Sequence, residues 1–66
     1  NSISDAGVAA LCIRTAVMGA YLNVKINCKD LEDKTYVNNI LLKAKSVVQK
    51  TNLIEKEILI IVDDKL

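Results

Sequence analysis

The sequence predicts an all-α fold, an antiparallel two-helix hairpin that is part of a larger multi-helix bundle or oligomer. Its 66 residues include no proline and only two glycines, which argues against a loop-rich or turn-rich fold. Apolar residues make up 52% of the chain and aromatic residues only 3%. The apolar residues recur at helical spacing in two long segments, which one short charged segment, residues 28–34, separates.

The first helix is expected over about residues 3–26. Ser2 and Asp5 have the spacing of a capping box, and Ser4 is a competing N-cap. Asp5 then lies in the first turn, where a carboxylate suits the helix dipole. Asn27 is the expected stop, because asparagine tolerates the left-handed backbone that ends many helices. The turn is therefore expected over residues 27–33.

This first segment is apolar on almost every side, and Arg14 is its only charged residue between positions 6 and 24. It is almost long enough to span a bilayer, but Arg14 near its centre costs about 2.5–3.5 kcal/mol on insertion scales. A helix that is apolar nearly all round is otherwise a buried one. We therefore expect burial in a larger assembly rather than a membrane, with Arg14 and Lys25 on the only edge near water.

One face of the first helix carries a stripe of small or polar side chains, which we call the small-residue stripe. Its members follow one another at alternating spacings of four and three: Asp5, Ala9, Cys12, Ala16, Gly19 and Asn23. Small residues permit close helix packing. The same face would also suit the lining of a ligand cavity, with Asp5 and Asn23 as its polar ends. Spacing alone favours the packing interpretation.

The second helix is expected over about residues 34–65, with Asp33 as its N-cap. Its apolar residues form an a/d seam, which Leu41, Val48 and Val62 widen. The seam consists of Val37, Ile40, Ala44, Val47, Thr51, Ile54, Ile58 and Ile61. Residues 34–50 carry four lysines and no acid, whereas residues 51–66 carry four acids and two lysines. An antiparallel neighbour would match the basic half to the acidic half, although an ordinary solvated helix surface explains the charges equally well.

Composition and cysteine spacing exclude several classes of function. A net charge of +1 gives no electrostatic reason to expect nucleic acid or an anionic membrane surface. The chain has no histidine, and two cysteines alone cannot form a structural zinc site. Cys12 and Cys28 are separated by roughly 24 Å if the segment is helical, too far for a disulfide. Free thiols indicate a cytoplasmic protein.

Two linked motifs resemble the formiminotetrahydrofolate cyclodeaminase / methenyltetrahydrofolate cyclohydrolase family. Residues 1–10 are similar to its Asn-x-x-Ser-Asp-x-x-Val-Ala-Ala stretch, and residues 19–27 to its Gly-Ala-x-x-Asn-Val-x-Ile-Asn stretch. The resemblance covers essentially the whole chain but only about the C-terminal third of the family domain. The Pro-Gly-Gly-Gly-Ser stretch that the family carries near its start is missing, and Cys28 stands where leucine is common.

The resemblance implies one-carbon folate chemistry. A cyclodeaminase closes 5-formiminotetrahydrofolate to 5,10-methenyltetrahydrofolate and releases ammonia, and a cyclohydrolase interconverts the methenyl form with 10-formyltetrahydrofolate. The partners implied are a tetrahydrofolate derivative and either the remainder of the family domain or copies of this chain, as a homodimer or higher oligomer. No metal or redox cofactor is needed beyond the folate substrate. The 66-residue piece alone is expected to be inactive.

The resemblance also places a site at the start of the first helix. Asp5 is the candidate catalytic residue, with an orienting or cation-stabilising role, and Asn1, Ser4 and Asn23 are candidate substrate-binding residues. The proton-transfer residue is expected outside these 66 residues. Alternatively, Ser4 and Asp5 merely cap the helix. The competing function is a non-enzymatic helical oligomerisation module, which the heptad seam supports.

Overall fold

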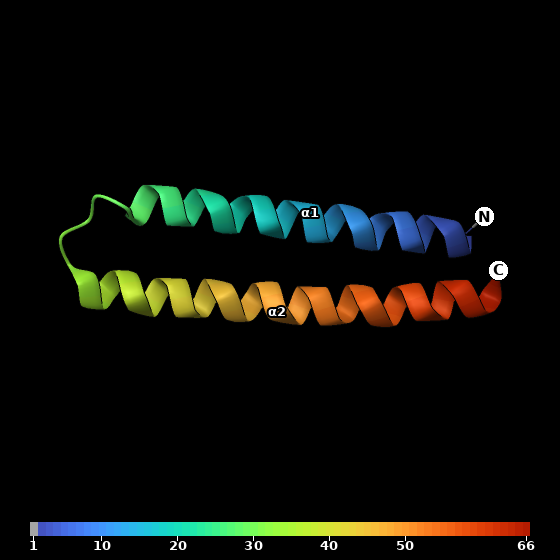
Figure 1. Ribbon diagram of the computed structural model, residues 1–66. Coiled ribbons are helices and arrows are strands. Elements are labelled where there is room, and N and C mark those ends of the chain that lie inside the picture. The colour runs from blue at the N-terminus through green and yellow to red at the C-terminus, as the bar shows by residue number, and fades with distance from the viewer. Residues whose placement is uncertain (1) are drawn as a thin grey trace.

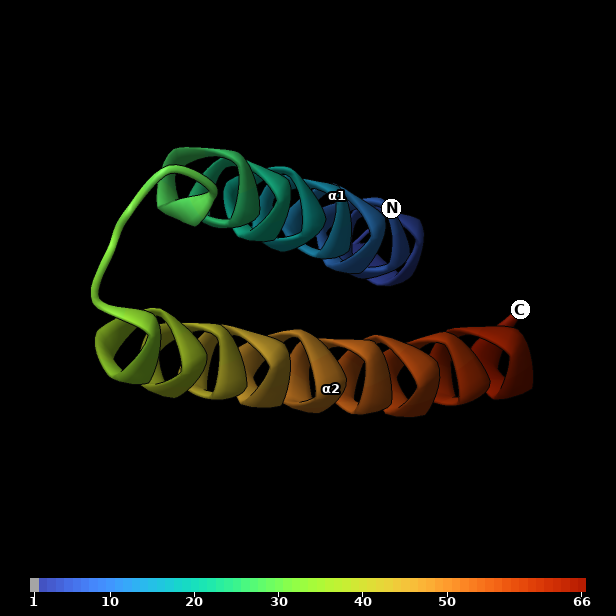
Figure 2. The same cartoon turned by 60° about the vertical axis from the view of Figure 1, so that its left-hand side comes forward.

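A computed structural model describes residues 2–66, which form two antiparallel helices. Helix α1 spans Ser2–Cys28 and helix α2 spans Lys34–Lys65, and the described residues contain no strand. The helices lie side by side along their length, and both chain ends lie at the same end of the hairpin (Figures 1 and 2). The hairpin measures 50 × 15 × 10 Å. The expected all-α hairpin is confirmed.

The start of α2 depends on Asp33. This residue has extended backbone angles, φ −74° and ψ 91°, and its Oδ1 accepts a hydrogen bond of 3.0 Å from the backbone N–H of Tyr36. The bond satisfies one of the free N–H groups that every helix leaves in its first turn. Asp33 is therefore the N-cap, as the sequence predicts.

The end of α1 differs from the expectation. The helix continues through Asn27 to Cys28, and none of the described residues has a positive φ. The turn closes with right-handed backbone instead: the N–H of Leu31 donates to the Cys28 carbonyl at 3.2 Å, and Lys34 Nζ donates to the Leu31 carbonyl at 3.0 Å. Asn27 was predicted as a left-handed stop, but these bonds make such a residue unnecessary.

The start of α1 also differs from the expectation. Ser2 already belongs to the helix, and Ser4 lies within its first turn. An N-cap residue precedes the helix and has non-helical backbone angles. Neither serine is therefore the N-cap, and the predicted capping box over residues 2–5 is wrong. Asp5 does lie in the first turn, as predicted.

The helices meet along one heptad-spaced line on each. The line on α1 consists of Ile3, Gly7, Ala10, Arg14, Val17, Tyr21, Val24 and Cys28, and the line on α2 of Val37, Leu41, Ala44, Val48, Thr51, Glu55, Ile58 and Val62. Apart from Arg14, every member is buried or half-buried. A Cβ added at Gly7 would lie 3.6 Å from both Val62 methyl groups, and Arg14 pairs with Glu55. Seven residues separate these contacts on each helix, so the register is constant along the hairpin.

The seam on α2 is rotated relative to the prediction. Leu41, Val48 and Val62, expected only to widen the seam, lie on the line that faces α1. The predicted seam residues Val47, Ile54 and Ile61 are exposed at 54%, 55% and 57%. The apolar stripe of α2 is wider than one neighbouring helix covers, and α1 covers the edge that contains Glu55.

The environment of Arg14 was predicted only in part, because Arg14 is exposed, as expected, but also contacts α2. It was expected on a water-facing edge of α1, but that edge faces α2. Arg14 Nε lies 2.8 Å from Glu55 Oε2, with the Arg14 side chain 44% exposed and the Glu55 side chain 14% exposed. Lys25 lies about three turns further along the same side of α1 and is exposed, with its Nζ 5.4 Å from the centre of the Tyr21 ring.

Most of α1 remains uncovered. By length and composition α1 is apolar enough to cross a membrane, and only 11% of that stretch is buried in the hairpin. One such helix is weak support for a membrane protein, because core helices of larger soluble domains have the same composition. The buried apolar residues are few and small: Ala10, Cys28, Val37, Val48 and Val62. The hairpin therefore leaves most of its apolar surface exposed.

The contact at Gly7 generates a stability prediction. Both Gly7→Ala and Gly19→Ala should raise the free energy of unfolding, by up to about 1 kcal/mol each, because alanine favours a helix over glycine. At Gly7 the new methyl group finds ordinary contact distance to Val62, and at Gly19 it meets open space. Gly7→Leu should destabilise the hairpin, whereas Gly19→Leu should not. Thermal unfolding by circular dichroism, at one fixed protein concentration, measures all four. Equal tolerance of leucine at both positions would contradict the helix contact.

Candidate functional site

The start of α1 holds the residues that the sequence predicted as a site. Ser4 and Asp5 both lie in its first turn and both are exposed. Asn1, the third candidate at this end, lies outside the described residues. The N-terminal turn of a helix presents free N–H groups and the positive end of the dipole. Ser4 and Asp5 are therefore close in space and reachable by a ligand.

Asn23 shares a face with Asp5 but is far from it. The two residues are eighteen positions apart, which is five whole helical turns or roughly 27 Å along the axis. Both are exposed, as are all the members of the small-residue stripe between them. A Cβ added at Gly19 would meet no atom within 4 Å. Asn23 and Asp5 therefore cannot contact the same reacting group.

The small-residue stripe faces away from α2. Its members lie on the side of α1 opposite to the line that contains Gly7, Arg14 and Cys28. The close packing that the stripe permits is therefore not packing against α2. The stripe is an outward surface of the hairpin.

The end of the hairpin near Asp5 is acidic. The first turn of α1 and the last turn of α2 lie at the same end (Figures 1 and 2). The last turn of α2 contributes Asp63 and Asp64, which are exposed, against the single cation of Lys65. The carboxylates lie at one end of the hairpin but on different faces, Asp5 on the side of α1 turned away from α2 and Asp64 on the flank of α2 turned away from α1. The acidic character therefore belongs to the whole end and not to one cluster. Sequence analysis missed it because the two turns are sixty residues apart in the chain.

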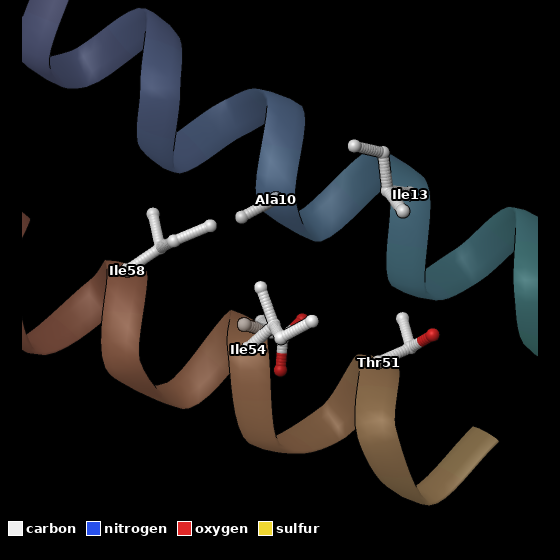
Figure 3. Close-up of a pocket in the computed structure, with 6 residues that line it drawn as sticks. Ala10, Ile13, Thr51, Ile54 and Ile58 are labelled. Carbon is white, nitrogen blue, oxygen red and sulfur yellow. The ribbon is translucent and has the colours of Figure 1, made fainter. Parts of the chain in front are cut away.

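A groove runs between the helices on one face of the hairpin and contains two hollows. The first, of about 90 Å³, is lined by Ala10, Ile13, Thr51, Ile54, Glu55 and Ile58. Figure 3 shows Ala10 and Ile13 opposite Ile54, Ile58 and Thr51. The second, of about 200 Å³, is lined by Val17, Ala20, Tyr21, Val24, Ala44, Val47 and Val48.

Both hollows are smaller than typical ligand pockets of about 300–1,000 Å³. Ser4, Asp5 and Asn23 line neither of them. The hollows are apolar, apart from Glu55 and the hydroxyl groups of Thr51 and Tyr21. The structure therefore does not bring the predicted polar residues to a cavity, and the groove is better suited to apolar side chains than to a polar substrate.

The ion pair between Arg14 and Glu55 is a polar feature that sequence analysis missed. The helical wheel placed Arg14 correctly, opposite the small-residue stripe. The error lay in assigning that edge to water instead of to α2. The signal that would have identified the pair is the heptad register, because Arg14 and Glu55 occupy matching places on the two contact lines. Glu55 lies at one side of the smaller hollow, and the pair is in the same register as the contact between Gly7 and Val62, one heptad away on each helix.

Residues 2–66 contain no group of three or more histidine, cysteine, aspartate or glutamate side chains that could hold a metal ion. Both cysteines are free thiols, Cys12 exposed and Cys28 buried. Both lie in α1, sixteen positions apart, which is too far for a disulfide between them.

Comparison with known proteins gives one consistent result. The family model described as formiminotransferase-cyclodeaminase matches residues 1–46. The formimidoyltransferase-cyclodeaminase of Rattus norvegicus is 40% identical over 50 residues, which are 76% of this chain and 9% of the relative. The chain thus spans less than a tenth of the length of that relative. No solved structure matches the chain.

The Arg14–Glu55 pair generates a prediction about coupling. Arg14→Met, Glu55→Gln and the double variant should show a coupling free energy of about 0.5–1 kcal/mol, kept small because Arg14 is partly exposed and screened by solvent. The coupling should shrink in high salt. A cycle that combines Lys25→Met with Glu55→Gln is the control and should be additive. Denaturant unfolding at fixed protein concentration measures the coupling free energy. If the Arg14–Glu55 cycle is additive, the pair does not help to hold the two helices in register.

Proposed function

The chain belongs to the formiminotransferase-cyclodeaminase family, and from this premise we propose that it is the C-terminal helical hairpin of a one-carbon folate enzyme. The enzyme would form or hydrolyse 5,10-methenyltetrahydrofolate. The observation that carries the proposal is the family match over residues 1–46, which includes all four candidate site residues, Asn1, Ser4, Asp5 and Asn23. The rat relative is named as a cyclodeaminase, and this favours the cyclodeaminase reaction over the cyclohydrolase reaction.

In the proposed reaction, N10 of 5-formiminotetrahydrofolate attacks the formimino carbon. The new C–N10 bond gives a tetrahedral adduct. The former imine nitrogen takes up the proton that N10 loses and one further proton, its bond to carbon breaks, and it leaves as ammonia. The product is the 5,10-methenyl cation. Its positive charge is shared between N5 and N10, so a fixed carboxylate nearby stabilises the charge as it develops.

We assign this electrostatic role to Asp5. Two features support it: Asp5 is exposed, and it lies in the first turn of α1. Ser4 lies beside Asp5 and would bind polar atoms of the folate, as would Asn1. Asn23 is too distant to join them, so any folate contact it makes belongs to another part of the ligand. We place the proton-transfer residue outside these 66 residues.

We further propose that the working enzyme is cytoplasmic and that the hairpin acts only with the remainder of the family domain or with copies of itself. Free Cys12 and Cys28 support a reducing compartment. The exposed apolar surface of both helices supports the need for cover. No metal or redox cofactor takes part in the proposed reaction.

The exposed seam on α2 favours a second candidate function, a non-enzymatic helical oligomerisation module. Val47, Ile54 and Ile61 are each more than half exposed at heptad spacing, a pattern typical of helix association. The two functions make different demands on Asp5, since an oligomerisation module does not need a carboxylate there.

A chimeric enzyme tests the folate proposal. The 50 matched residues of the rat relative are replaced by their counterparts from this chain, and cyclodeaminase turnover is measured. We expect the chimera to keep turnover within about tenfold of the parent enzyme, because both the site residues and the buried contact line are supplied. The control is a chimera with the same composition and a shuffled heptad pattern. A chimera that folds and assembles like the parent but has no turnover would contradict the proposal.

Asp5→Asn in that chimera tests the site. Removal of the charge should lower kcat by at least about tenfold, and up to the 10²–10³ that loss of a transition-state stabilising group costs. Asn keeps the size and polarity of the side chain, so helix content should not change. Asp30→Asn, in the turn at the far end of the hairpin, is the matched control and should leave kcat unchanged. Normal turnover with Asp5→Asn would leave Asp5 with only a structural role in the first turn.

A further inference from the structure

One edge of the apolar stripe on α2 extends beyond the surface that α1 covers, although its inner members, Ala44, Thr51 and Ile58, also lie on the line that faces α1. Ile40, Val47, Ile54 and Ile61 lie seven residues apart, and the last three are exposed at 54–57%. Ala44, Thr51 and Ile58 lie between them, half-buried. Together these seven residues, which we call the outer seam, repeat at spacings of four and three, the pattern of a helix that packs against another helix.

The groove follows the same edge of α2. Ile13 and Ile54 line the first hollow, and Ala20 and Val47 line the second, so the hollows are displaced by seven residues on both helices. Thr51 is half-buried, and its hydroxyl donates a 2.9 Å hydrogen bond to the Val47 carbonyl, so the donor is satisfied within α2. Val47 and Ile54 belong to the outer seam and also line the hollows, so the seam and the groove adjoin each other. Figure 3 shows one stretch of this edge, with Ile54, Ile58 and Thr51 opposite Ala10 and Ile13.

The charges beside the outer seam identify the partner. On the flank away from α1 lie Lys43, Lys50, Glu57 and Asp64, again seven residues apart and all exposed. None of them forms an ion pair within residues 2–66, where the Arg14–Glu55 pair is formed instead. None has an oppositely charged residue three or four positions away in its own helix. The flank thus has two cations followed by two anions, all without a partner.

We propose that the outer seam binds the outer seam of a second copy of this chain, with the two α2 helices antiparallel about a two-fold axis near Ile54. In this register Ile54 meets its own equivalent and Val47 meets Ile61. Lys50 then lies opposite Glu57, and Lys43 lies opposite Asp64. The two-fold axis repeats each pair, so four unlike-charge contacts border the apolar interface. Each α2 would have its own α1 on one side and the second α2 on the other, the arrangement of a four-helix bundle.

The exposed area fits such a dimer. The chain exposes 5209 Å², whereas a compact monomer of 7.2 kDa exposes roughly 4,100 Å². The excess, roughly 1,100 Å², belongs to both helices together and leaves room for the ~800 Å² that each partner buries in an interface of standard size. This inference depends only on α2 and its charges. It holds or fails independently of the folate chemistry assigned to the start of α1.

Charge reversal across the proposed axis tests the interface. The dissociation constant of the 66-residue chain is measured by sedimentation equilibrium, with helicity followed by circular dichroism. Lys50→Glu places two pairs of like charges across the axis, and so does Glu57→Lys. Each should weaken the dimer by about tenfold or more. Lys56→Glu, on the opposite side of α2, changes the net charge of the chain by the same amount and should have no effect.

A mixture of the two single variants gives the decisive result. One chain then carries two acids and the other two lysines at positions 50 and 57, so the mixed dimer regains both unlike-charge pairs and should form at wild-type affinity. The Lys50→Glu, Glu57→Lys double variant should also recover. A wild-type chain that stays monomeric at high micromolar concentration overturns the proposal. So does a dimer in which Lys50→Glu acts no differently from Lys56→Glu, or a mixture that does not recover, because association then uses another surface.

Discussion

The width of the apolar stripe on α2 is the constraint on which the rest of the structure depends. One neighbouring helix covers only part of it, and α1 covers the edge that contains Leu41, Val48 and Val62. This choice puts Glu55 opposite Arg14 and Gly7 opposite Val62, and so determines the register. It also leaves Val47, Ile54 and Ile61 exposed. Register, ion pair and unpartnered surface are three consequences of one geometric limit.

Local signals in the sequence predict the elements well. The charged segment over residues 28–34 places the turn, and Asp33 has the residue type and position of an N-cap. Its hydrogen bond to Tyr36 depends only on residues three positions apart. The helix ends that were predicted wrongly are ones for which more than one local backbone arrangement is possible. Asn27 would have stopped α1 with left-handed backbone, but the chain turns with two hydrogen bonds beyond Cys28.

The relative rotation of the helices could not be predicted, because it depends on both helices at once. A helical wheel shows that α2 has a broad apolar stripe and that Arg14 lies opposite the small-residue stripe. It does not show which edge of either helix meets the other. The rotation follows only when the charges are compared between helices, since Arg14 is the one cation within the apolar part of α1 and Glu55 lies on one edge of the stripe on α2. The candidate site has the same limit: Ser4 and Asp5 could be placed together, whereas the presence of Asp63 and Asp64 at the same end of the hairpin depends on the pairing of the two helices.

The small-residue stripe on α1 was open to two interpretations, close packing and a ligand-lining face, and its length separates them. Asp5 and Asn23 are roughly 27 Å apart along the helix axis. This distance is five helical turns and is much longer than one reacting group. The central members, Ala9 to Gly19, are exposed and have no polar side chain besides the Cys12 thiol. A surface of this kind suits the close approach of another helix, whereas the start of α1 has the hydroxyl and carboxylate that a polar ligand needs. We infer that both interpretations apply, each to a different part of this face: close packing to the middle of α1 and ligand binding to its start. Packing along the middle of α1 would hold the helix in place, and the same packing would position Ser4 and Asp5 at its free end.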